Sequence, residues 1–232
     1  TDHARSLTSG ALPEDLDAAF PPADSGILDP NAPADAMTIT VAVGASLFDK
    51  RYGLSAQRPA QLIRMEEFEN DGLKAEFCHG DLLVQICANS RERVLHATRS
   101  IIRNFPDLLA PRWMQDGFLP QRRDKSTPRN LLGFKDGTSN IKATDSAQMD
   151  ALVWVRPDRN GEPAWAAGGS YMVVRLIRNF VERWDRASLS EQEAIMGRHK
   201  VSGAPLGLSG EHDEPGFSTN PADTTTAMDA HI

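Results

Sequence analysis

The chain has 232 residues, 40% of them hydrophobic and 25% charged, and its net charge is −7 at pH 7. This composition fits one large globular domain or two small ones, and it excludes disorder over the whole length. The basic residues are scattered along the sequence and form no stripe, so nucleic acid is not an expected partner. No stretch is apolar over enough residues to span a membrane as a helix.

An arm and two strands are expected in the first half of the chain. Residues 1–36 are rich in Pro, Asp and Ala and lack a lasting periodicity, which predicts an N-terminal extended arm. Alternating β-branched residues over 37–43 and an apolar run over 81–88 each predict a strand. Cys87 lies in the second expected strand and Cys78 just before it. Because an extended chain separates the two sulfur atoms too far for a disulfide, we expect two separate buried thiols.

A helix is expected after the second strand. Asn89 and Glu92 have the spacing of a capping box, and the apolar residues of 94–105 recur at helical intervals. A strand or hairpin arm is expected over 114–119. Strands and helices in this order predict an α+β fold, in which helices pack on one face of an antiparallel sheet.

The second half of the chain repeats part of this order. The apolar runs 152–155 and 169–177 predict further strands. Ser188 and Glu191 predict a second capping box, and the helix that it opens is expected to end at Gly197. Because this helix again follows a strand, an incomplete second copy of the first unit is expected to begin near residue 168.

The most unusual stretch is 130–140, which places one acid, Asp136, between Gly133 and Gly137. Glycines on both sides permit positive φ angles and the close approach of a ligand or another chain. An ordinary Asp-Gly turn explains the same letters. The spacing fits neither a phosphate-binding loop nor a calcium loop. Among chemical roles, a carboxylate held in this way best fits a proton-transfer group that faces a ligand.

Histidine provides two further candidates for a site. His231 lies two residues after Asp229, and this spacing alone gives little support for a ligand role. His212 stands between Glu211 and Asp213, which allows a metal site, although neighbouring side chains of an extended loop point in different directions. Both interpretations stay open at the level of single residues.

The residues taken together resemble a known family. Gly133-Phe134-Lys135-Asp136-Gly137 matches the Gly-x-x-Asp-Gly motif of the dye-decolorising (DyP-type) haem peroxidases, and the similarity runs from about residue 25 to residue 232. The segments that look like the exported deferrochelatase/peroxidase branch of that family are 37–40, 44–49, 78–88, 130–140, 168–171, 184–186, 202–207 and 211–213.

The resemblance implies a fold and a haem site. Two ferredoxin-like domains are expected: the first over 37–140, ending in the haem loop, and an incomplete second one over 141–232. The cofactor implied is heme b. His231 is similar to the proximal ligand of the haem iron, and Asp136 is similar to the distal catalytic acid. Gly137, Thr138 and Ser139 match the segment that runs along the haem edge.

The resemblance also implies an activity. We expect a haem peroxidase that reduces hydrogen peroxide and oxidises small phenolic or dye substrates, with release of iron from haem and intact protoporphyrin as a second reaction for iron uptake. The alternative is a haem-binding or haem-carrying protein without turnover. Family members are exported to the periplasm, and a homo-oligomer is compatible with the resemblance. The residues after Thr1 lack a signal peptide's apolar core, as they do in a mature protein whose leader has been removed.

The sequence departs from the family pattern in two respects, of which the first is that the N-terminal strand expected before residue 25 is missing. The second is that family members continue past His231 and Ile232 through a further segment that contains a distal arginine. We therefore expect this sequence to be a fragment of a longer protein.

Overall fold

The computed structural model describes residues 1–10, 19, 26–29, 31–119, 126–159, 161–215, 226, 230 and 231. The chain folds into two compact units. The first contains Thr1–Asp116 and Arg156–Gly168, and the second contains Gly117–Val155 and Gly169–Ile232. The domain boundary that the sequence predicts at residue 140 stays a prediction.

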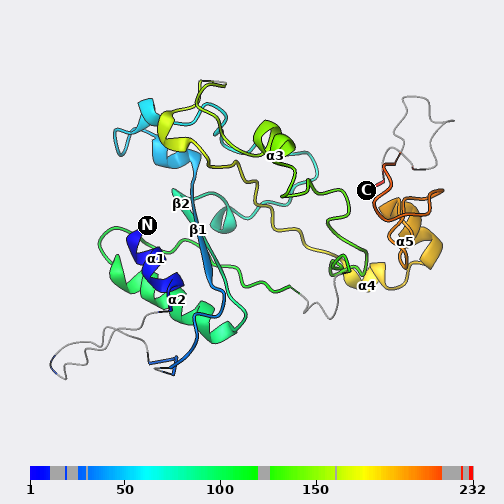
Figure 1. Ribbon diagram of the computed structural model, residues 1–232, viewed down its shortest axis with the longest axis horizontal. Helices are drawn as coiled ribbons and strands as arrows, with labels where there is room; N and C mark the ends of the chain where they lie inside the picture. The colour runs from blue at the N-terminus through cyan, green and yellow to red at the C-terminus, as the bar shows by residue number, and fades with distance from the viewer. Residues whose placement is uncertain are drawn as a thin grey trace. The chain divides into compact units, whose positions relative to one another are not determined.

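The first unit is built on a two-stranded antiparallel sheet (Figure 1). Strand β1, Thr38–Val43, pairs with strand β2, Leu82–Cys87, so that Thr38 lies opposite Cys87 and Val43 lies opposite Leu82. Both strands are confirmed. The two cysteines are free, but Cys87 is exposed and not buried as expected. Cys87 is next to Ile86, whose side chain packs on the core, and successive side chains of a strand point to opposite faces.

Two helices, α1 and α2, cover one face of this sheet (Figure 1). Their bounds are Asp2–Thr8 and Arg91–Asn104. The core cluster consists of Leu7 in α1, Met37 just before β1, and Ala97 in α2. Ile39 and Ile86, which lie opposite each other in the sheet, pack against this cluster. An antiparallel sheet with helices on one face confirms the α+β class.

Helix α1 corrects the expectation of an extended arm at the start of the chain. Residues 2–8 form two helical turns that bury a single apolar side chain, Leu7, which is too few for a periodicity to show in the sequence. Most of the expected arm between residues 11 and 30, including Phe20-Pro21-Pro22, lies outside the described residues.

Helix α2 is confirmed, but its predicted capping box is wrong. The N-cap residue is Ser90, whose side chain makes no capping hydrogen bond. The carboxylate of Asp35 instead accepts a hydrogen bond from the Ser90 amide at 2.6 Å. Hydrogen bonding by Ser90 is the main reason that the pKa of Asp35 is lowered. A residue distant in the sequence thus takes the place that Asn89 and Glu92 were expected to fill.

Three predicted strands are absent from the described part of the chain. Residues 114–119 follow Arg112 and Trp113, whose side chains donate to backbone carbonyls of 75–79, so side chains and not a ladder attach this segment. Leu152 is the last residue of helix α3, Ser146–Leu152, whose first turn is capped by the Asp145 side chain, which accepts from the Gln148 amide at 3.0 Å. Residues 169–177 have the apolar pattern of a strand but no pairing strand in the described ranges.

The second capping box is confirmed in helix α5, Leu189–Met196. The Ser188 side chain accepts from the Glu191 amide, and the Glu191 carboxylate accepts from the Ser188 amide. Gly197 ends the helix in the left-handed conformation at φ 70°, as expected. The remaining elements are short: helix α4, Val181–Trp184, and the 3-10 turns Ala45–Phe48, Ser55–Gln57, Ala75–Phe77 and Ala164–Ala166. No helix within the described ranges is long and apolar enough to span a membrane.

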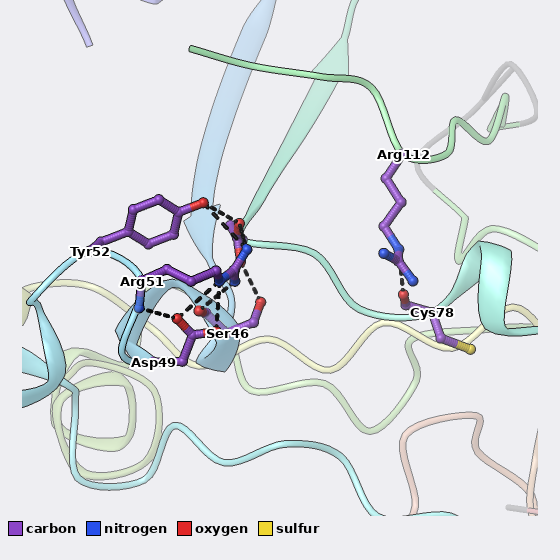
Figure 2. A network of polar contacts seen from close by, with 7 residues as sticks. Ser46, Asp49, Arg51, Tyr52, Cys78 and Arg112 are labelled. Atoms are coloured by element: carbon purple, nitrogen blue, oxygen red, sulfur yellow. Dashed lines mark hydrogen bonds and ion pairs between the residues drawn. The ribbon is translucent and has the colours of Figure 1, made fainter.

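A polar network fixes the loop after β1 to the start of β2 (Figure 2). The Asp81 carboxylate accepts hydrogen bonds from the Ser46 hydroxyl at 2.7 Å, from Arg51 at 2.7 Å and from the Tyr52 hydroxyl at 3.1 Å. Arg51 also donates to Asp49 at 2.8 Å. The Ser46 and Arg51 donors lower the pKa of Asp81, and the Asp81 carboxylate in turn raises the pKa of Arg51.

Replacing Asp81 with Asn tests this network. Because the folded protein lowers the pKa of Asp81, its stabilisation is present above the unfolded pKa of about 3.9 and is lost as the pH falls. At pH 7 we expect Asp81→Asn to lower the Tm by about 3 °C. The difference from wild type should shrink in urea or thermal unfolding below about pH 4. Asp107→Asn, at an exposed position of the same unit, is the control, and an equal loss there contradicts the role of the network.

Candidate functional site

The predicted acid, Asp136, lies at the end of a small hairpin in the second unit. Arg129 and Lys135 form a β-bridge, and the Asp136 amide donates to the Pro128 carbonyl at 2.8 Å. The Asn130 side-chain oxygen accepts from the amides of Leu132 at 3.0 Å and Phe134 at 3.2 Å, which closes the turn.

Two features of this turn favour glycine at position 133. Its φ of 88° is a left-handed conformation that residues with a Cβ rarely adopt. A Cβ atom there would also lie 3.0 Å from the Cε atom of Lys200. The glycine therefore allows the hairpin to approach the chain that follows helix α5.

Phe134 anchors the hairpin to the rest of the unit. Its side chain is 1% exposed and makes an edge-to-face contact with Trp184, with the ring centroids 5.9 Å apart. The Lys200 ammonium lies 5.4 Å from the centre of the Phe134 ring, and the Trp184 indole N–H donates to the Leu132 carbonyl at 3.3 Å. Asp136, two residues further along the chain, is exposed.

The Asp136 side chain is exposed, and it makes no hydrogen bond or ion pair with any described residue. Gly137 follows with φ 97°, and the half-buried Thr138 and the exposed Ser139 complete the predicted haem-edge segment. The structure therefore presents the carboxylate on an ordered loop and leaves its oxygens accessible.

The chain after α5 binds the loop on both sides of Asp136. Lys135 forms an ion pair with Glu211, and Arg198 donates to the Ser139 hydroxyl at 3.1 Å. The Nδ1 atom of His212 lies 3.1 Å from the Thr138 carbonyl oxygen. The side chains around the predicted acid are thus already engaged with one another.

The surroundings shift the pKa values of Arg198 and Glu211. Burial lowers the pKa of Arg198, which is 6% exposed. Hydrogen bonds from Lys135 and then Thr127 lower the pKa of Glu211. The metal site that the sequence allowed at 211–213 has no support here, since Glu211 pairs with Lys135 and no cluster of three ligand side chains occurs among the described residues.

The predicted ligand, His231, belongs to the same unit. Its amide donates to the carbonyl of Ile195 in α5 at 2.9 Å, and its exposed imidazole makes no hydrogen bond within the described part of the chain. His231 and the Asp136 loop, which are distant in sequence, therefore attach to neighbouring parts of the segment 195–212. Asp229 and Ile232 lie outside the described residues.

Arg198 and Glu211 are the residues that sequence reasoning missed. No role was predicted for Arg198, and Glu211 was predicted only as a possible metal ligand and as part of a segment that resembles the family. The basic stretch Arg198-His199-Lys200 just after a helix was the only available signal, and it does not reveal the distant partners Lys135 and Ser139. A separate hollow of about 400 Å³ in the first unit contains none of the predicted site residues; it is lined by Arg64, Met65, Glu66, Glu67, Leu73 and His79.

Family models identify the class of protein. The model for the N-terminal part of Dyp-type peroxidases matches residues 1–119, and the model for the C-terminal part matches residues 127–232. The chain therefore belongs to the Dyp-type peroxidase family.

Curated relatives support this family assignment. The deferrochelatase of Yersinia pestis bv. Antiqua (strain Nepal516) is 50% identical over 236 residues, which cover 100% of this chain and 54% of the relative. The deferrochelatase of Escherichia coli (strain K12) is 50% identical over 227 residues, which cover 96% of this chain and 53% of the relative. The chain thus spans about half the length of these relatives.

Solved structures show the fold. A DyP-type peroxidase from Streptomyces coelicolor is 33% identical with a TM-score of 0.84, covering 99% of this chain and 61% of that one. Ferric DtpA from Streptomyces lividans is 33% identical with a TM-score of 0.84, and the match covers 99% of this chain and 60% of that one. This similarity confirms the expected ferredoxin-like α+β class.

Proposed function

We propose that the chain is part of a haem-dependent peroxidase that reduces hydrogen peroxide and oxidises phenolic or dye substrates. One observation carries the proposal in a chain of this family: Asp136 and His231 are both exposed, have no side-chain partner among the described residues, and attach to the same segment of one unit. An accessible carboxylate and an accessible imidazole are the two groups that haem peroxidase chemistry needs from the protein.

The residues present fit a haem. One imidazole is sufficient as the protein ligand of a haem iron, and the ring of His231 is available for that role. Gly137, Thr138 and Ser139 carry no large side chain, so the edge of a flat cofactor can approach this segment. We propose heme b, because covalent attachment uses a Cys-x-x-Cys-His motif and Cys78 and Cys87 lack that spacing.

When bound, the haem supplies a redox-active iron for the reduction of peroxide. The chain's own part in the reaction is proton movement and orientation. An Asp136 carboxylate oxygen accepts the proton of hydrogen peroxide and returns it to the leaving oxygen, which departs as water. The loop's tethers keep this carboxylate in one place during the transfer.

A second reaction of the same site is release of iron from haem with the porphyrin left intact. The specific support is the name deferrochelatase of two relatives that are 50% identical to this chain. The alternative of a haem carrier without turnover has less support, because both sets of relatives are named as enzymes. The expected periplasmic location and a homo-oligomeric state belong to the same proposal.

The catalytic role of Asp136 is tested by Asp136→Asn, which keeps the size of the side chain and removes its basicity. We expect the haem absorbance to stay unchanged, while the rate of reaction with hydrogen peroxide in stopped-flow experiments falls by about 100-fold or more. Asp185→Asn, at an exposed acid of the same unit, should react at the wild-type rate. Loss of haem from Asp136→Asn contradicts a purely catalytic role.

The ligand role of His231 is tested by His231→Ala. Because the iron loses its only protein ligand, we expect the Soret band to weaken and shift and haem to be lost on gel filtration. His79→Asn is a control that removes an imidazole from the first unit, at a backbone position of φ 59° that Asn tolerates. A Soret band identical to that of wild type refutes the assignment.

The iron-release reaction is tested by incubating the protein with haem under reducing conditions. Because free protoporphyrin fluoresces and haem does not, we expect porphyrin fluorescence to appear with the wild-type protein and to be absent with His231→Ala. Rapid peroxide-dependent dye oxidation without any porphyrin fluorescence rejects the deferrochelatase reaction and leaves the peroxidase proposal in place.

A further inference from the structure

The direction of the Asp136 side chain depends on its backbone. The carboxylate has no partner among the described residues, so nothing at its own tip fixes its position. The neighbouring residues are fixed instead: Lys135 precedes Asp136, and Ser139 follows it within the turn that the Asn140 amide closes by donating to the Gly137 carbonyl. The groups that hold these two neighbours therefore set where the carboxylate points.

Glu211 holds the loop on the side before Asp136. Its carboxylate pairs with Lys135, and the two side chains are only 22% and 16% exposed, respectively, so solvent screens the pair weakly. The other carboxylate oxygen accepts from the Thr127 hydroxyl at 2.7 Å, at the beginning of the hairpin. Gly203 lets the chain pass close to this pair, since a Cβ atom there would lie 2.6 Å from the Cδ atom of Lys135.

Arg198 holds the loop on the side after Asp136. Its guanidinium donates to the Ser139 hydroxyl at 3.1 Å, to the Gly203 carbonyl at 2.8 Å and to the Glu211 carbonyl at 3.1 Å. Arg198 is almost fully buried, and the planar fork of arginine suits several acceptors at once. Because it binds the backbone of Glu211, Arg198 joins the two tethers into one support.

We propose that Glu211 and Arg198 are positioning residues for proton transfer by Asp136. This inference rests on the proposed peroxidase function and extends it to two side chains that do not touch the substrate. A misplacement of about 1 Å at a reacting group can cost up to about 100-fold in rate. Tethers on both sides of the acid restrict this kind of displacement.

The first test removes one tether at a time. Glu211→Gln keeps the shape of the side chain and removes the charge that binds Lys135, and Ser139→Ala removes the hydroxyl that Arg198 binds. We expect the rate of reaction with hydrogen peroxide to fall about tenfold in Glu211→Gln and less in Ser139→Ala, with the Soret band and haem affinity retained. Glu182→Gln, an exposed acid of the same unit, is the charge-matched control.

A double-mutant cycle separates positioning from general damage. If Glu211 acts through Asp136, the Glu211→Gln change should cost less than about twofold in a protein that already carries Asp136→Asn. A further tenfold loss in that background means that Glu211 supports the fold as a whole, and it overturns the positioning role.

A measurement without haem distinguishes this inference from the proposed function. Amide hydrogen exchange in residues 135–139 should become faster in Glu211→Gln and Ser139→Ala than in wild type or Glu182→Gln. If the exchange rates are unchanged, these contacts do not restrain the loop, and the positioning role is overturned regardless of the haem experiments. Faster exchange with a wild-type peroxide rate overturns positioning and leaves the peroxidase proposal intact. A wild-type protein that binds no haem overturns the proposed function, and the positioning role with it.

Discussion

The second unit depends on the attachment of the hairpin 128–139 to the chain that follows helix α5. Burial of Phe134 against Trp184 supplies the apolar part of this attachment, and Lys135, Ser139 and their partners supply the polar part. Apolar burial is not directional, whereas charged hydrogen bonds fix geometry. The hairpin uses both, because Phe134 keeps the loop packed and the tethers, in the positioning role proposed above, orient Asp136.

The same division of roles appears in the first unit. Leu7, Met37 and Ala97 form the apolar centre between the helices and the sheet. The Asp81 network then fixes how the loop after β1 joins β2 (Figure 2). In each unit one carboxylate, Asp81 or Glu211, accepts hydrogen bonds from donors on a different segment of the chain. These bonds fix the path of loops that have few regular backbone hydrogen bonds of their own.

These arrangements give the proposed chemistry a physical basis. A proton-transfer group needs accessible oxygens and a fixed position, and these demands conflict, since contacts that fix a side chain also occupy it. The hairpin resolves the conflict by fixing the neighbours of Asp136 and leaving its carboxylate without a protein partner. His231 follows the same principle, because its backbone is bound to Ile195 and its imidazole is available.

The sequence by itself determined the local features. Periodicity predicted β1, β2 and α2, the Ser188–Glu191 spacing predicted the capping box of α5, and the Gly-x-x-Asp-Gly motif identified the loop of the family to which the chain belongs. Each of these signals lies within a few residues, where covalent geometry and side-chain alternation decide the outcome. The roles of Asp136 and His231 remain proposals that rest on that motif and on the resemblance.

Only the tertiary structure decided which distant groups meet. Asp35 caps α2 in place of Asn89, residues 169–177 lack a pairing strand in the described ranges, and Arg198 and Glu211 hold the Asp136 loop. Strand pairing and charge pairing both depend on partners far away in the chain, and a local pattern carries no information about them. The sequence therefore determined where the Asp136 carboxylate stands in the chain, and the packing of the chain after α5 decided which residues hold its loop.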